Sequence, residues 1–251
     1  MSSERTPVIA ANWKMHKTLA EARAFCEELL PLVVDAEAEV IVCPSFLALP
    51  LVAELCAESA VDVAAQSMHF ASEGAFTGEV SPAMLLDAGA SSVVLGHSER
   101  RQLFGETDEA LSRKVPAALE AGLRPILCVG ETEEERERDD TDRVLRRQID
   151  AGLARVPAER LGDVVIAYEP VWAIGTGKTA TPDQAEDACG FLRALIASRD
   201  SGAAERIRIQ YGGSVKAANA AELLGRGEID GALVGGASLD PEGFAAIVAA
   251  A

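Results

Sequence analysis

Residues Ile207–Ser238 read IRIQYGGSVKAANAAELLGRGEIDGALVGGAS, with two short apolar runs on either side of an Ala-, Leu- and Glu-rich segment. The runs IRIQY, from residue 207, and GALVG, from residue 231, have the length and residue types of β-strands. The segment between them contains no proline and is rich in helix-forming residues. A strand, a helix and a second strand in this order predict a parallel βαβ unit in an α/β protein.

The same pattern recurs along the chain. Apolar, β-branched runs also occur as VIAA from residue 8, VIVC from 40, VDVAAQ from 61, SVVLG from 92, RPILCV from 124 and VVIAY from 164, which makes eight runs in all. As a group they lack strict alternation, which is typical of strands buried on both faces. Eight strand–helix pairs in 251 residues predict an α/β protein with a single-domain (β/α)8 barrel over residues 1–251. A doubly wound open sheet is the alternative, and the lack of a G-x-G-x-x-G motif after the first run disfavours it.

Capping residues predict where helices begin. Thr18 and Glu21 are spaced as a capping box. Ser81, Thr181 and Asp240 each precede a proline, which fits a cap followed by a first-turn proline.

Two segments make the helix prediction less regular. The acidic run ETEEERERDD, from Glu131, is predicted to open one helix and to form a solvated face. Pro116 falls inside a helix that Thr107 is expected to cap, and it is predicted to kink or break that helix near Ser112–Val115. A helix that starts afresh at Pro116 is the alternative.

Composition and charge exclude several classes of protein. The chain is 49% hydrophobic and 25% charged, as expected of a soluble globular protein with a large core. A net charge of −17 disfavours binding to nucleic acid or to an anionic membrane as the main function. Five scattered cysteines without a C-x-x-C pair indicate reduced thiols, with no disulfide framework and no zinc site. No apolar run reaches the roughly 18 residues of a membrane span and no signal peptide is evident, so we predict a cytoplasmic protein.

In a (β/α)8 barrel the active site lies at the carboxyl ends of the strands. The polar residues just after the predicted strands are therefore the candidate site. They are Asn12 and Lys14 after the first run, His97 and Glu99 after the fourth, Glu169 after the sixth, and the glycine turns Gly212–Ser214 and Gly235–Gly236 after the last two. Backbone N–H groups of such turns bind phosphate, and the loops after strands 7 and 8 often hold it. Lys14 lies two residues after Asn12, so strand alternation predicts that both face the site.

Glu169 is the candidate general base. It precedes Pro170 and an apolar segment that offers no cation, so burial is predicted to make the carboxylate a stronger base. Gly175 and Gly177 would let this segment close over the site as a lid. His97 precedes a predicted helix start, and a helix N–H aimed at its ring is predicted to keep the imidazole neutral.

The segments ANWKM, LGHSERR, YEPVWAIGTGKTATP, YGGSV and GALVGGASL, taken in order, closely resemble the signature segments of the triosephosphate isomerase family. The resemblance runs from about residue 8 to the C-terminus. It implies a TIM barrel that interconverts dihydroxyacetone phosphate and D-glyceraldehyde 3-phosphate without a metal or cofactor. It further implies a set of roles: Glu169 as base, neutral His97 as electrophile, Asn12 and Lys14 as stabilisers of the enediolate, Gly175, Ser214, Gly235 and Gly236 as phosphate ligands, and Ser98, Glu99 and Cys128 as supporting residues.

The family resemblance also implies a homodimer formed through the loop at residues 66–82, with Thr77 bracing the site of the partner. His16 and Ser67 differ from the residues that the family more often has, which concerns only the expected interface. Two other functions stay open: another phosphate-binding barrel enzyme such as a Schiff-base aldolase, for which Lys14 is the only candidate amine, and a binding protein without catalysis.

Overall fold

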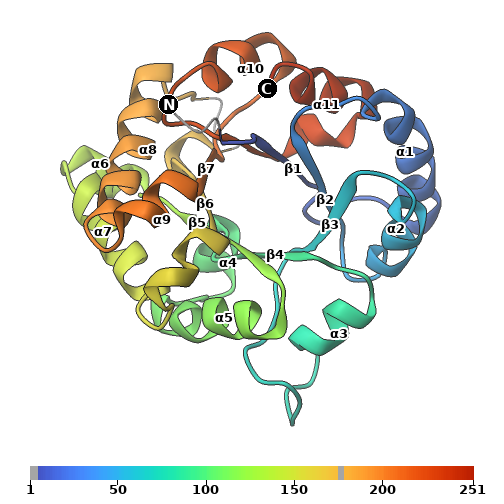
Figure 1. The fold of residues 1–251 in the computed structure, drawn as a ribbon, viewed down its shortest axis with the longest axis horizontal. Helices are drawn as coiled ribbons and strands as arrows, with labels where there is room; N and C mark the ends of the chain where they lie inside the picture. Colours follow the sequence, from blue (N-terminus) through green and yellow to red (C-terminus); the bar gives the residue numbers. More distant parts are fainter. Residues whose placement is uncertain (1–4, 175–177) are drawn as a thin grey trace.

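The computed structural model describes residues 5–174 and 178–251, and within them eight parallel strands form one closed barrel (Figure 1). The strands are β1 Val8–Asn12, β2 Glu39–Cys43, β3 Val61–Ala65, β4 Ser92–Leu95, β5 Arg124–Val129, β6 Val165–Tyr168, β7 Arg208–Tyr211 and β8 Gly231–Val234. Neighbours in the chain are neighbours in the sheet, and β1 also pairs with β8, which closes the ring. The predicted (β/α)8 barrel is confirmed, and each of the eight predicted runs overlaps a strand.

Helices surround the barrel (Figure 1). They are α1 Leu19–Leu32, α2 Leu49–Cys56, α3 Pro82–Asp87, α4 Ser98–Leu103, α5 Asp108–Ala121, α6 Glu133–Glu137, α7 Thr141–Gly152, α8 Pro182–Ala197, α9 Ser201–Arg206, α10 Ala217–Leu224 and α11 Pro241–Val248, with short 3-10 helices η1 Ala158–Asp163, η2 Val171–Ala173 and η3 Gly236–Leu239. Each predicted cap is confirmed: Thr18 forms a capping box with Glu21, and the side chains of Ser81, Thr181 and Asp240 each accept a first-turn N–H.

The strands are buried on both faces, which explains why their sequences do not alternate as a group. One set of side chains, such as Val8, Ala10 and Ile126, fills the inside of the barrel. A larger set, such as Ile9, Leu127 and Ile166, packs between the strands and the helices. Removal of this apolar surface from water stabilises the ring and fixes the strand ends that carry the site.

Helix α5 runs without a break from Asp108 to Ala121, with Thr107 as its cap and Pro116 inside it. The predicted break and the predicted fresh start at Pro116 are both wrong. Leu111, Val115 and Leu119 bury one side of the helix in the core, and this packing outweighs the local cost of proline. A bend of the helix axis at Pro116 stays a prediction.

The acidic run from Glu131 opens a helix, as predicted, but this helix is the short α6. Asp139 then adopts a left-handed φ of 59° and α7 begins. Glu131 itself is fully buried, so the predicted solvated face is wrong for this residue.

The long loop between β3 and α3 extends away from the barrel, as Figure 1 shows below the ring. Across residues 5–174 and 178–251, no helix has the length and apolarity needed to cross a membrane.

Candidate active site

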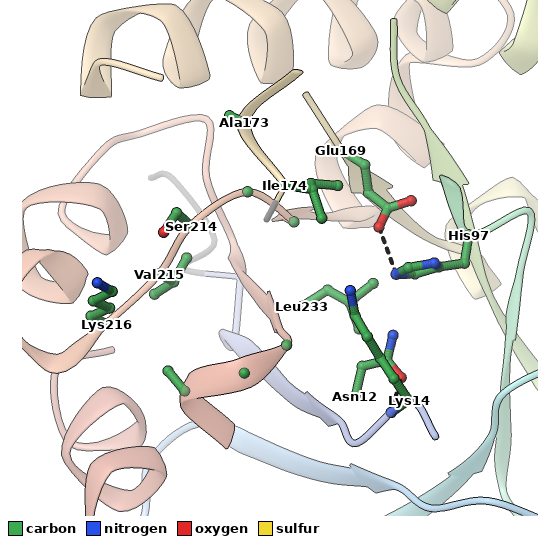
Figure 2. Close-up of a pocket in the computed structure, with 15 residues that line it drawn as sticks. Asn12, Lys14, His97, Glu169, Ala173, Ile174, Ser214, Val215, Lys216 and Leu233 are labelled. Carbon is green, nitrogen blue, oxygen red and sulfur yellow. Dashed lines mark hydrogen bonds and ion pairs between the residues drawn. The ribbon is translucent and has the colours of Figure 1, made fainter. Parts of the chain in front are cut away.

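A pocket of about 530 Å3 opens at the carboxyl ends of the strands (Figure 2). Among the described residues it is lined by Asn12, Lys14, His97, Glu169, Ala173, Ile174, Gly212, Gly213, Ser214, Val215, Lys216, Leu233, Gly235, Gly236 and Ala237. Figure 2 shows the first four of these on one side, Ser214, Val215 and Lys216 on the other, and Leu233 between them. The fold therefore brings together every predicted pocket residue except Glu99, which lines an adjoining pocket, and Gly175, which lies outside the described residues.

Glu169 follows β6 and is 2% exposed. Its carboxylate lies between two partners: Oε2 accepts the N–H of Ser98 at 2.8 Å, and Oε1 lies 2.9 Å from Nε2 of His97. These contacts hold the side chain against the start of α4.

The pKa of Glu169 is lowered from its usual value. Burial is the largest single influence and raises the pKa, but the attraction and hydrogen bond of His97, the N–H of Ser98 and the charge of Lys14 together outweigh it. The prediction of a carboxylate made more basic by apolar cover is therefore wrong for this arrangement. The sequence neighbours of Glu169 contain no cation, whereas the fold brings groups of β1 and α4 to it.

His97 caps helix α4, and its Nδ1 accepts the N–H of Glu99 at 3.2 Å. The single proton of a neutral ring then lies on Nε2, which points at Glu169. Two influences on the ring oppose one another. Burial lowers the pKa of His97, while the Glu169 carboxylate raises it and prevails. The Glu169 charge therefore favours a protonated ring, whereas the N–H of Glu99 favours the neutral ring, because it points at Nδ1, where a second proton would have to sit.

Lys14 reaches the pocket by a different route from the one predicted. Strand β1 ends at Asn12, so strand alternation does not place Lys14. Instead Lys14 adopts a left-handed φ of 52°, its N–H donates to Oδ1 of Asn12 at 3.1 Å, and its Nζ lies 2.6 Å from Oε1 of Glu99. The strained backbone turns the ammonium group back toward the mouth of the barrel.

The two glycine turns lie side by side because β7 and β8 are neighbours in the barrel. Gly235 and Gly236 stand at the start of η3, and the side chain of Asn219 donates to the carbonyl of Ser214 at 3.0 Å. Lys216, which the sequence analysis did not single out, also lines this side of the pocket. Backbone N–H groups and a lysine in one place favour an anion such as phosphate.

The three predicted supporting residues have different positions. Ser98 contacts Glu169 through its N–H, and Glu99 pairs with Lys14. Cys128 is buried inside the barrel on β5, and burial raises the pKa of its thiol well above the usual value. Its backbone carbonyl accepts a hydrogen bond from Arg101 at 3.0 Å, so β5 is tied here to α4.

Glu131 is a site residue that sequence reasoning missed. Its buried carboxylate accepts hydrogen bonds from Tyr168 Oη at 3.1 Å and Trp172 Nε1 at 2.8 Å, and it pairs with Arg136 at 3.1 Å. These contacts anchor the start of the segment that follows Glu169. No local pattern could have revealed them, because they join β6 and η2 to the loop after β5.

A buried ion pair between Glu106 and Lys114 was missed as well. Glu106 also accepts the N–H of Gly96, which directly precedes His97, at 2.9 Å. This hydrogen bond fixes the end of β4 to the segment that precedes α5.

Thr77 does not enter the pocket, since it is exposed in the long loop after β3.

Comparison with known proteins agrees with this geometry. The family model described as triosephosphate isomerase matches residues 7–251. Proteins named triosephosphate isomerase are similar to the chain: one from Carboxydothermus hydrogenoformans is 56% identical over 97% of this chain and 98% of its own length, and one from Citrifermentans bemidjiense is 54% identical with the same coverage. A third, from Symbiobacterium thermophilum, is 54% identical over 98% of this chain and 97% of its own length. The chain therefore belongs to the triosephosphate isomerase family.

Proposed function

We propose that this chain interconverts dihydroxyacetone phosphate and D-glyceraldehyde 3-phosphate through an enediolate. One observation carries the proposal: a buried carboxylate and a histidine, 2.9 Å apart, lie at one side of a pocket whose other side has two glycine turns and a lysine. A triose phosphate has a carbonyl group next to a hydroxyl-bearing carbon at one end and a phosphate at the other. The two sides of the pocket match these two ends.

In the proposed mechanism, Glu169 removes a proton from the carbon beside the carbonyl group. His97 donates from Nε2 to the carbonyl oxygen, and Lys14 and Asn12 stabilise the negative charge that develops there. Glu169 then returns the proton to the former carbonyl carbon, while His97 passes a proton to the former carbonyl oxygen and takes one from the original hydroxyl oxygen, which becomes the new carbonyl. The steps are proton transfers, for which positioned acid and base groups suffice.

The contacts of Glu169 support a way to activate it. His97, Ser98 and Lys14 hold its pKa low, while burial pulls the pKa up. A carboxylate that turns from His97 toward the substrate carbon loses the first two contacts but stays buried. Its basicity then rises at the moment when it is needed.

The segment from residue 170 to 180 is proposed to close over the substrate. Ala173 and Ile174 line the pocket and could cover it, while Gly175, proposed as a phosphate ligand, lies outside the described residues. Closure would exclude water from the enediolate.

The test is a coupled assay for D-glyceraldehyde 3-phosphate with the wild-type chain and with Glu169→Gln. We expect wild-type turnover and a loss of kcat of about 10²- to 10⁴-fold in the variant, because the general base is lost. Binding of inorganic phosphate should change little, since the glycine turns are intact. Near wild-type turnover in Glu169→Gln would refute the assigned role, and an inactive wild type would refute the function.

The Schiff-base aldolase is less well supported. Such an enzyme uses a desolvated amine, whereas Lys14 is ion-paired with Glu99. Borohydride reduction in the presence of dihydroxyacetone phosphate separates the two functions, because only an aldolase would be covalently trapped.

We further propose a cytoplasmic homodimer in which residues 1–251 form one domain. A second pocket of about 230 Å3 adjoins the first and is lined by the exposed apolar residues Met15, Phe46 and Phe104. The loop at 66–82 carries exposed Phe76 and Thr77, which suits it to fill such a pocket on a second copy. Sedimentation should give a dimer for the wild type and a monomer for Phe76→Asp, and a wild-type monomer at micromolar concentration would refute the proposal.

A further inference from the structure

Gln148 lies on α7, outside the pocket, but its side chain reaches the backbone at the end of β5. It is 4% exposed on the buried face of the helix, beside Leu145 and Ile149. Its Oε1 accepts the N–H of Gly130 at 2.7 Å, and its Nε2 donates to the carbonyl of Gly130 at 3.1 Å. One side chain therefore holds both backbone polar groups of a single residue, and both hydrogen bonds are buried.

Gly130 lies directly against the backbone of Glu169. A Cβ at position 130 would lie 1.7 Å from the carbonyl oxygen of Glu169, so only glycine allows the two chains to approach this closely. On either side, the N–H of Glu169 donates to the carbonyl of Val129 at 2.8 Å, and the N–H of Val171 donates to the carbonyl of Glu131 at 3.1 Å. Residues 129–131 thus fix the backbone position of residues 169–171, and Gly130 lies at the centre of this contact.

Glu169 is confined on its other side as well. The N–H of Gly212 donates to the carbonyl of Tyr168 at 2.7 Å. A Cβ at position 212 would lie 2.9 Å from Cγ of Glu169. A shift of Gly130 is therefore passed on to Glu169, because no free space between the three backbones can absorb it.

We propose that Gln148 is a positioning residue for Glu169, which it holds in place through Gly130. The inference rests on the proposed function, in which Glu169 is the base. A polar groove of about 270 Å3 adjoins the contact and is lined in part by Ser98, Gly130 and Gln148. Without the Gln148 side chain, water from this groove can bind the Gly130 peptide, and residues 129–131 lose their fixed position.

The position of the base matters for proton transfer, whereas the proposed phosphate ligands stand on the loops after β7 and β8. Loss of the Gln148 contact should therefore lower kcat and leave KM nearly unchanged. For Gln148→Met, which keeps the volume and removes both hydrogen bonds, we expect kcat to fall about 10- to 100-fold, the size of effect that a misplacement near 1 Å produces.

Gln210 provides a matched control. It is also a buried glutamine, and its Nε2 donates to the carbonyls of Val8 at 3.0 Å and Ala232 at 3.4 Å, at the amino-terminal end of β1. Gln210→Met should lower the melting temperature but change kcat less than about twofold, because the carbonyls that it binds lie at the amino-terminal ends of β1 and β8, away from the carboxyl ends that carry the pocket. An equal loss of kcat in both variants, or a kcat of Gln148→Met within twofold of wild type, would overturn the proposal.

A double-mutant cycle separates this proposal from the proposed function. If Gln148 acts only through Glu169, Gln148→Met should have less than about a twofold further effect in the Glu169→Gln background. Full additivity would show that Gln148 acts elsewhere, whereas near wild-type turnover of Glu169→Gln alone would refute the role of the base. Gln148→Glu keeps the acceptor for the Gly130 N–H but places a carboxylate oxygen against the Gly130 carbonyl, so kcat should fall at least as far as in Gln148→Met, again with little change in KM. It tests the same point should Gln148→Met not fold.

Discussion

The contact between Glu169 and His97 makes one carboxylate sensitive to pH in the folded chain. The pKa of Glu169 is lowered from its usual value of 4.5, so the unfolded chain binds this proton more tightly than the folded chain does. The stability that the ionised group contributes is then fully present above about pH 4.5. It is lost as the pH falls through the lower pKa of the folded state.

This gives a prediction for Glu169→Gln that does not depend on catalysis. The free energy of unfolding of the wild type relative to the variant should rise as the pH falls from 8 to about 6.5, because the Glu169 carboxylate raises the pKa of His97. It should fall again below pH 4.5, where the ionised Glu169 is lost. Urea unfolding at a series of pH values measures it. The pH-dependent part should shrink when the comparison is repeated in a His97→Gln background, because His97 is the main group that lowers this pKa. A difference that does not vary between pH 8 and pH 3 would contradict the prediction.

The strands and helix starts could be predicted from the sequence because their signals are local. β-Branched apolar runs mark strands wherever both faces are buried, and Thr18 or Thr181 can cap a helix with groups three residues away. Pro116 shows the limit of this approach. Proline destabilises a helix interior, yet α5 stays unbroken because its buried face packs against other elements of the fold. This packing cannot be seen in the local sequence.

Helix α5 offers a direct test of this balance. Pro116→Ala restores an N–H donor and removes a ring from the helix interior, against a loss of about 0.4–1 kcal/mol from the more flexible unfolded chain. We expect a net gain in stability of about 1–2 kcal/mol. Denaturant unfolding measures it, with Pro82→Ala as control. Pro82 stands in the first turn of α3, where proline fits, so that variant should be neutral or slightly destabilised. Destabilisation of Pro116→Ala would mean that the helix needs the proline.

The segment after β6 should report ligand binding through Trp172. Its Nε1 donates to buried Glu131 at 2.8 Å, and the Arg136 guanidinium lies 4.5 Å from its ring centre. Movement of this segment must change those surroundings, so a phosphorylated transition-state analogue should shift the tryptophan emission. The shift should persist in Trp13→Phe, since Trp13 is fully buried, and should be absent in Trp172→Phe. Saturation of the site without any change in emission would mean that the segment does not move.

The net charge of −17 raises the question of how an anionic substrate approaches the molecule. Lys14 and Lys216 both line the pocket, and a cleft focuses the field of the charges nearest to it. We therefore expect kcat/KM to fall with added inert salt, because screening weakens this local attraction more than the distant repulsion. Steady-state kinetics should measure kcat/KM from about 10 to 200 mM salt, a range over which the screening length of charges shortens several-fold.

A matched pair of variants assigns the salt effect to its source. Lys216→Gln should flatten the dependence, whereas Arg155→Gln should not, because exposed Arg155 follows α7 at the opposite end of the barrel. A rise of kcat/KM with salt in the wild type would show that the overall negative field dominates.

The composition of the pocket could be predicted to a large extent from the sequence, because parallel strands of a barrel deliver their carboxyl ends to one place. Asn12, His97, Glu169 and the glycine turns were found in this way. The groups that hold them could not be found, because Glu106, Glu131 and Gln148 act across elements that are distant in the sequence. The low pKa of Glu169 could not be predicted for the same reason: His97, Ser98 and Lys14, which lower it, are distant from Glu169 in the sequence.

The closed ring of strands has a consequence for the order in which the chain can become active. The pocket draws on β1, β4, β6, β7 and β8, so its two sides exist together only after the last strand has paired with the first. During synthesis, a chain that has folded as far as β6 already has Glu169 and His97 but lacks the glycine turns that follow β7 and β8. An intermediate of this kind cannot isomerise a triose phosphate or be rescued by one. Substrate therefore stabilises only the finished molecule, and ligand binding serves as a marker for the final step of folding.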